Sequence, residues 1–356
     1  MKNWKDLTLA EQRTILTNTA EENGLVENAV EKDWWVSMVL KALFQSSCAE
    51  ALAFKGGTSL SKGWGLIERF SEDIDLAIDR SFFGFNGELS KLQRTKLRKA
   101  SSKYIREELT VELDGLLQEM GIHDYAIILP DSKESDTDPE NIYVSYTTII
   151  EGVDENLTGY IPYQVKVEIS CRSLREPYEE RMLRSLIAEK YKEEEFSEEP
   201  FAVNTVSPTR TFLEKAFLLH EEFQKSVVRS LRMSRHLYDL EKLMDTSFGI
   251  KALEDTELYT TIVKHRFAFT KLSGVDYKLH HPSTINFLPP ESVIEDWKKD
   301  YEEMQENFIY GESLSFEKLI ERIAELVERF RKIQINDDSF LSCEYNPKNN
   351  TKSQNK

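Results

Sequence analysis

The sequence predicts an α+β protein in which a mixed sheet lies between two helical regions. Residues 8–47 and the chain after Ser207 repeat apolar side chains at helical spacing, whereas short segments between them alternate charged and apolar residues. A hydrophobic share of 40% and an aromatic share of 11% are typical of a packed globular protein. We therefore expect an N-terminal helical cap at 1–50, a mixed core at 51–200, a C-terminal helical domain at 201–340 and a disordered tail at 341–356.

The first part of the core joins a short strand to a helix. Residues 51–55 form an apolar run that ends at Gly56-Gly57, and residues 58–66 follow with helical character. Thr58 or Ser59 is the expected N-cap of this helix. Residues 73–78 then alternate charged and apolar types, which predicts a strand with both aspartates on one face because side chains alternate along a strand.

The rest of the core alternates a helix with strands. Residues 91–120 have the pattern of a long amphipathic helix that ends at Gly121. Strands are predicted at 125–129, 142–150 and 165–170, the first two joined as a long hairpin by a polar loop. The helical domain begins near Pro208, and Thr211 with Glu214 has the spacing of a capping box.

Composition limits the classes of protein that fit. The three cysteines are far apart in the sequence, which disfavours a disulfide framework and a zinc cluster. No 18-residue apolar run or secretory signal is present, so we expect a cytoplasmic protein without a membrane span. The net charge of −17 disfavours a nucleic-acid partner. However, residues 225–242 carry five basic against two acidic residues and are the candidate contact for RNA backbone.

Three segments together indicate a site for phosphate and a divalent metal. Gly56-Gly57 allows the backbone to approach a phosphate at a helix N-terminus. Asp73 and Asp75 supply paired carboxylates, the hard ligands that Mg²⁺ prefers, and Glu168 on another alternating strand would complete a two-metal clamp. Each segment taken alone also fits a purely structural interpretation. The glycines would form a tight turn, and the carboxylates would lie on a solvated strand face. Their combination at this spacing favours the site.

The segment FKGGTSLSKGWGLIERFSEDIDLAID resembles the first motif of the AbiEii/AbiGii nucleotidyltransferase toxins of type IV toxin–antitoxin, abortive-infection systems. The matching residues are Gly56, Gly57, Thr58, Leu60, Arg69, Ser71, Asp73 and Asp75. Similar segments follow in order: NAVEKDWWVSMVLKAL before the motif, VKVEIS with Glu168, TFLEKAFLLHEE with Lys215, and SRHLYDLEKLM with Arg235, Tyr238 and Asp239. The resemblance implies a polymerase-beta-like nucleotidyltransferase core.

The resemblance also implies roles. The catalytic set would be Asp73, Asp75, Lys215 and Asp239, with Mg²⁺ or Mn²⁺ on Asp73, Asp75 and Glu168. The nucleotide-binding set would be Gly56, Gly57, Thr58, Ser59, Arg69, Ser71, Lys215 and Arg235. Lys215 would meet phosphates, and Asp239 would act as a general base or orient the acceptor hydroxyl. The helical domain would then close a cleft over the carboxylates.

These features leave the acceptor open. The family implies NMP transfer from an NTP to an acceptor, with the 3′ end of tRNA favoured, growth or translation inhibited in phage defence, and a cognate antitoxin as partner. The alternatives are NMP transfer to a protein hydroxyl, which the net charge favours, and a catalytically silent regulatory module. His220, His236, His280 and His281 have no zinc-ligand spacing and are expected to be structural or surface residues. Asp239 also fits an ordinary helix ion pair with Arg235.

Overall fold

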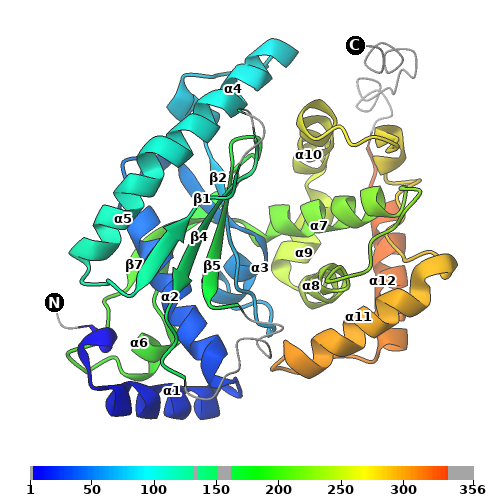
Figure 1. The fold of residues 1–356 in the computed structure, drawn as a ribbon. Coiled ribbons are helices and arrows are strands. Elements are labelled where there is room, and N and C mark those ends of the chain that lie inside the picture. The colour runs from blue at the N-terminus through cyan, green and yellow to red at the C-terminus, as the bar shows by residue number, and fades with distance from the viewer. Residues whose placement is uncertain (1–2, 132–134, 136, 151–161, 336–356) are drawn as a thin grey trace. The chain divides into compact units, whose positions relative to one another are not determined.

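A computed structural model of the chain describes residues 3–131, 135, 137–150 and 162–335 (Figure 1). The chain divides into two compact units, Met1–Val206 and Ser207–Lys356, which are described separately. The tail expected at residues 341–356 lies outside the described residues, as does part of the polar loop expected between the hairpin strands.

The first unit is built on a seven-stranded mixed sheet with the strand order β3-β4-β5-β2-β1-β7-β6. β2 is parallel to β5 and β1 is parallel to β7, while the other neighbours are antiparallel. The predicted hairpin is β3-β4. The strands are β1 Leu52–Lys55, β2 Ile74–Ile78, β3 Tyr125–Ile128, β4 Glu140–Tyr146, β5 Gln164–Ser170, β6 Tyr178–Leu183 and β7 Phe201–Val206.

Helices pack against this sheet. Trp35 of α2 stacks on Tyr146 of β4 with ring centroids 4.8 Å apart, and α2 is buried along most of its length. The helix predicted at 91–120 is present, with a π-helical segment between α4 and α5. The helices and turns of this unit are η1 Trp4–Asp6, α1 Leu9–Asn23, α2 Glu27–Leu43, η2 Ala49–Ala51, α3 Gly56–Thr58, η3 Ser59–Gly63, η4 Arg80–Phe83, α4 Lys91–Tyr104, η5 Ile105–Leu109, α5 Thr110–Glu119 and α6 Leu186–Lys190.

Two strands and two helix starts differ from the sequence prediction. β6 was not predicted because it is an edge strand rich in charge, and such strands lack the usual alternation. β7, which lies between β1 and β6, was also not predicted. α3 begins at Gly56 rather than after a Thr58 or Ser59 cap, and its N-cap residue Lys55 makes no side-chain capping bond. The predicted capping box is also wrong, because α7 begins at Pro208, three residues before Thr211.

The second unit is helical. Its core contains the rings of Phe212, Phe217, Tyr259, Phe287 and Phe330, all buried. Its helices and turns are α7 Pro208–Glu222, α8 Arg235–Leu243, α9 Ser247–Glu254, α10 Thr256–Phe269, η6 Tyr277–His280, η7 Glu291–Val293, α11 Ile294–Asn307 and α12 Phe316–Arg331. Across the described part of both units, no helix is long and apolar enough to cross a membrane.

Candidate active site: a glycine turn beside a carboxylate face

The turn between β1 and α3 requires glycine at two positions. Gly56 has φ +81°, a conformation that costs an L side chain energy, and a Cβ there would collide with Oδ2 of Asp75. A Cβ at Gly57 would lie 2.6 Å from a guanidinium nitrogen of Arg69 and 2.8 Å from Oγ of Ser71. The two glycines therefore let the turn contact the later residues of its own motif.

Hydrogen bonds hold the two ends of the motif together. Thr58 Oγ1 lies 2.9 Å from Oγ of Ser71 and donates to the carbonyl of Asp73 at 2.6 Å. Ser59 Oγ donates to the carbonyl of Gly56 at 2.9 Å and is fully buried. Arg69 is only 4% exposed. Thr58, Ser59 and Arg69 therefore shape the turn from within.

The carboxylates of the motif share one face of the sheet. Asp75 of β2 is in register with Glu168 of β5, and both are half-buried. The buried side chains that alternate with them on both strands include Leu76 and Val167, which face the core. By the same alternation Asp73, one residue before β2, points to the side of Asp75. The structure therefore places the three predicted metal ligands on one sheet face.

A lysine shares this face. Lys166 Nζ lies 2.9 Å from Oε2 of Glu168. Burial alone lowers the pKa of Lys166, but the hydrogen bond and charge of Glu168, with the charges of Asp73 and Asp75, raise it overall. The sequence pattern did not distinguish Lys166, although it lies two positions before Glu168 on the same alternating strand.

The donor chemistry of this face fits a hard divalent cation. Three carboxylates supply oxygen ligands, and Oδ1 of Asn141, the cross-strand neighbour of Glu168, is buried with no hydrogen-bond partner. Within the described residues, however, no three His, Cys, Asp or Glu side chains are gathered closely enough to hold a metal ion. Binding of an ion by all three carboxylates would therefore require their side chains to move closer together.

Three consecutive charged residues of α2 tie the motif to the rest of the unit. Lys32 Nζ contacts Oε2 of Glu72 at 2.5 Å and donates to the carbonyl of Pro162 at 3.0 Å. Asp33 accepts from Nζ of Lys62 at 2.6 Å, and Glu31 accepts from Thr148 Oγ1 at 2.6 Å and from the Ile149 amide at 3.1 Å. Glu72 lies directly before Asp73, so α2 helps to fix the carboxylate-bearing strand. The sequence pattern linked this segment to the family but indicated no role for it.

In the second unit, Lys215 of α7 and Asp239 of α8 form a buried ion pair. Nζ of Lys215 lies 2.7 Å from Oδ2 of Asp239, and the two side chains are 8% and 0% exposed. Nδ1 of His236 lies 3.5 Å from the same amine. Asp239 thus pairs with a lysine of another helix, a contact that the sequence pattern did not reveal.

The basic stretch at residues 225–242 is partly neutralised. Lys225 and Arg229 both bind the buried carboxylate of Glu222, at 2.7 Å each. Lys242 donates to the carbonyl of Glu312 at 2.8 Å. These contacts leave less positive charge for RNA than the sequence indicated. The stretch ends in α8, on which Arg235 occupies the first position.

Two of the histidines belong to a buried network in the second unit. Glu221 binds Arg266 through both carboxylate oxygens, and His280 Nε2 lies 3.2 Å from Oε1 of Glu221. The His220 ring meets the His280 ring edge-on at 4.8 Å. Burial, then the charge of His280, lowers the pKa of His220 to about 4. These contacts describe a structural network.

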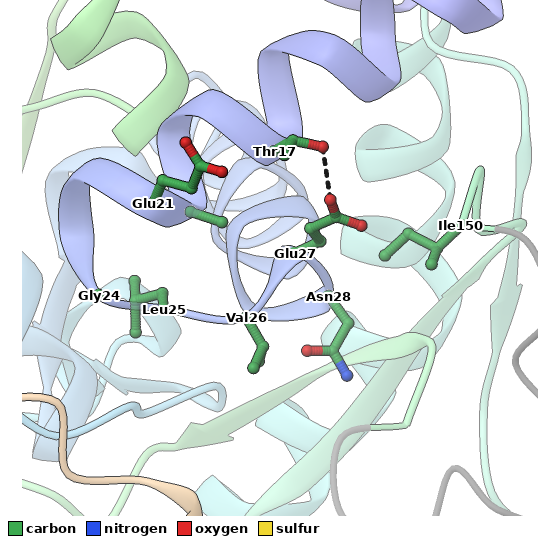
Figure 2. Close-up of a pocket in the computed structure, with 9 residues that line it drawn as sticks. Thr17, Glu21, Gly24, Leu25, Val26, Glu27, Asn28 and Ile150 are labelled. Carbon is green, nitrogen blue, oxygen red and sulfur yellow. Dashed lines mark hydrogen bonds between the residues drawn. The ribbon is translucent and has the colours of Figure 1, made fainter.

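A hollow of about 540 Å³ lies elsewhere in the first unit, at the turn between α1 and α2. Figure 2 shows Thr17 and Glu27 joined by a hydrogen bond at its rim, with Val26 and Ile150 nearby. None of the predicted site residues lines it.

A glycine turn, paired strand carboxylates and a mixed sheet are the features of a nucleotidyltransferase. The family described as nucleotidyl transferase AbiEii toxin, type IV TA system, matches residues 39–328. The chain therefore belongs to this family of nucleotidyltransferase toxins, and the family implies an NTP substrate and an antitoxin partner. The fold is similar to that of MenT4, a nucleotidyltransferase toxin from Mycobacterium tuberculosis H37Rv, with TM-score 0.59, 16% identity and coverage of 95% of this chain and 94% of that one. No curated protein matches the sequence.

Proposed function

We propose that this toxin transfers NMP from an NTP to the 3′ end of tRNA in the cytoplasm and thereby inhibits growth or translation in phage defence. The observation that supports transfer at this site is the convergence of the motif. Thr58 is hydrogen-bonded to Ser71, Arg69 lies against Gly57, and Gly56 packs directly on Asp75. In the reaction, the acceptor hydroxyl loses its proton to solvent, its oxygen forms a bond to the α-phosphorus, and the bond from that phosphorus to the bridging oxygen breaks, which releases pyrophosphate.

We propose that Asp73, Asp75 and Glu168 hold Mg²⁺ or Mn²⁺. A bound divalent ion supplies charge neutralisation for the triphosphate and lowers the pKa of the attacking hydroxyl. The turn at Gly56 and Gly57 would receive phosphate oxygens through its backbone amides. Lys166 would provide the positive charge of this face when no ion is bound.

In the second unit, we propose that Lys215 and Arg235 meet the phosphates of the nucleotide or acceptor. The ion pair with Asp239 supports an orienting role for that carboxylate, because a side chain that is 0% exposed and bound to Lys215 fixes the direction of the ammonium group. Removal of Asp239 should therefore impair Lys215 as well.

The test is labelling of purified tRNA with each of four α-³²P NTPs. Asp73→Asn and Lys215→Met should each reduce labelling at least a hundredfold, whereas Glu180→Gln, which removes an exposed carboxylate from edge strand β6, should leave it unchanged. Undiminished labelling in Asp73→Asn refutes the site. Labelling by the wild-type protein should stop when Mg²⁺ and Mn²⁺ are removed with a chelator and return when either ion is added back.

The net charge of −17 favours a second acceptor, a protein hydroxyl. The same assay distinguishes the two, because RNA and protein fractions are separated before counting. If only the protein fraction is labelled, the acceptor is a protein and not tRNA, and the proposed active site is unaffected by that result.

A further inference from the structure

A strongly basic surface of the first unit lies on α4, away from the predicted site. Residues 90–106 contain seven lysines and arginines and no acidic residue, in a chain of net charge −17. Arg106 is bound to Glu140 and to the carbonyl of Pro130, whereas the four lysines of α4 are exposed. An amphipathic helix can fold without carrying only positive charges, so folding alone does not explain this cluster of lysines and arginines.

Three lysines of α4 form a stripe along one side of the helix. Leu97, Ser101 and Ile105 are buried against the unit, and Lys96, Lys99 and Lys103 lie on the opposite, exposed side at helical spacing. Seven residues at a rise of about 1.5 Å each place these three amines along about 10 Å of helix. Lys103 makes an exposed pair with Glu107 at 3.9 Å, a contact that water screens strongly.

The stripe lies toward the opposite end of β2 from the glycine turn, so we do not assign it to the triphosphate. Tyr104 of α4 packs on Phe82 of η4 with ring centroids 5.0 Å apart, and η4 follows the C-terminal end of β2. The carboxylates and the glycine turn lie toward the N-terminal end of β2, where Asp73 and Asp75 are about 17 Å and about 10 Å from Ile78 at roughly 3.4 Å per strand residue. Figure 1 shows α4 and α3 at different ends of the sheet.

We propose that Lys96, Lys99 and Lys103 of α4 form a docking surface for the sugar–phosphate backbone of the RNA acceptor, an inference that rests on the proposed function. The helix presents point charges and one large exposed apolar side chain, Leu92. Lysine is depleted from protein–protein interfaces, which need apolar anchors, whereas phosphate contacts dominate nucleic-acid binding. An extended polyanion is therefore favoured over an acidic protein, and its length allows it to span the distance to the carboxylates.

The experiment measures tRNA binding by the full chain without NTP at several salt concentrations. The triple variant Lys96→Gln, Lys99→Gln and Lys103→Gln should bind on the order of tenfold more weakly, and its log–log salt slope should fall by about 2 to 3. The matched control changes three exposed lysines on helices of the other unit, Lys251→Gln, Lys264→Gln and Lys318→Gln, and should bind as the wild type does.

Other results of this experiment test the docking surface on α4 separately from the NMP-transfer reaction. An unchanged salt slope, or loss of antitoxin binding with tRNA binding intact, overturns it. NTP affinity should be equal in all three proteins, and a parallel loss in the α4 variant also overturns it. If the wild type binds tRNA through α4 but labels only protein, the docking surface stands and the tRNA acceptor proposal fails.

Discussion

The buried pair Lys32–Glu72 offers a direct measure of how α2 supports the site. Its nitrogen and oxygen lie 2.5 Å apart, and the side chains are 2% and 5% exposed. Lys32→Met leaves the Glu72 carboxylate buried without this cation, and removal of one partner of a buried pair costs about 3–5 kcal/mol. That is a large fraction of the roughly 5–15 kcal/mol that stabilises a typical protein.

Urea unfolding followed by tryptophan fluorescence is suited to this measurement. Trp4, Trp34, Trp35 and Trp64 are in the first unit, so the signal reports mainly on it. The double variant Lys32→Met with Glu72→Met should regain much of the lost free energy of unfolding, since two apolar side chains can replace a buried pair.

The control for this cycle is Glu107→Gln, which breaks an exposed pair with side chains 68% and 63% exposed and should cost less than about 0.5 kcal/mol. A loss below about 1 kcal/mol in Lys32→Met, or a double variant no more stable than that single variant, would refute the reasoning. In that case the Lys32–Glu72 pair would not hold the Asp73 strand.

Two other predictions concern the glycine turn and the histidine network. Gly56→Ala should keep the fold but reduce NMP transfer at least tenfold, because a φ of +81° strains alanine and the added Cβ displaces Asp75. The control Gly115→Ala, at a position on α5 with open space around it, should be fully active. Labelling and circular dichroism check both variants, and an active Gly56→Ala would disprove the close approach of Gly56 to Asp75. The pKa of His220 is about 4 in the folded protein and 6.5 in the unfolded chain. The stability that comes from burying the neutral ring is therefore fully present above pH 6.5 and is lost as the pH falls toward 4, because the unfolded chain then binds a proton that the folded protein does not. Unfolding free energies should drop by about 2 kcal/mol from pH 7 to pH 5, less so in His220→Asn, and a pH-independent value would contradict this.

Much of the first motif could be predicted from the sequence because its structure is local. The alternation of Asp73 to Ile78 has the period of a strand, and β2 forms there. Two glycines before a helical segment predicted the turn, although α3 begins at Gly56 itself. The family match over residues 39–328 spans the segment from Gly56 to Asp239. These residues alone therefore sufficed to predict a nucleotidyltransferase.

Other features depended on packing between distant segments. Lys32 and Glu72 are 40 residues apart, and Lys215 and Asp239 lie on different helices, so no local period encodes either pair. β6 was missed because it is a charge-rich edge strand whose side chains are mostly exposed or half-buried, so its sequence lacks a clear apolar alternation. β7 is paired on both sides and was also not predicted, although its burial alternates.

The sequence by itself determined the glycine turn, the aspartate strand and the family, because each depends on residues within one or two elements. The tertiary structure alone decided which residues support them. It placed Lys166 on the carboxylate face, paired Glu222 with two of the basic residues expected to bind RNA, and turned three lysines of α4 to the exposed side. The physical reason is that a charge acts according to its burial and its partners, and both are set by chain segments far away in sequence.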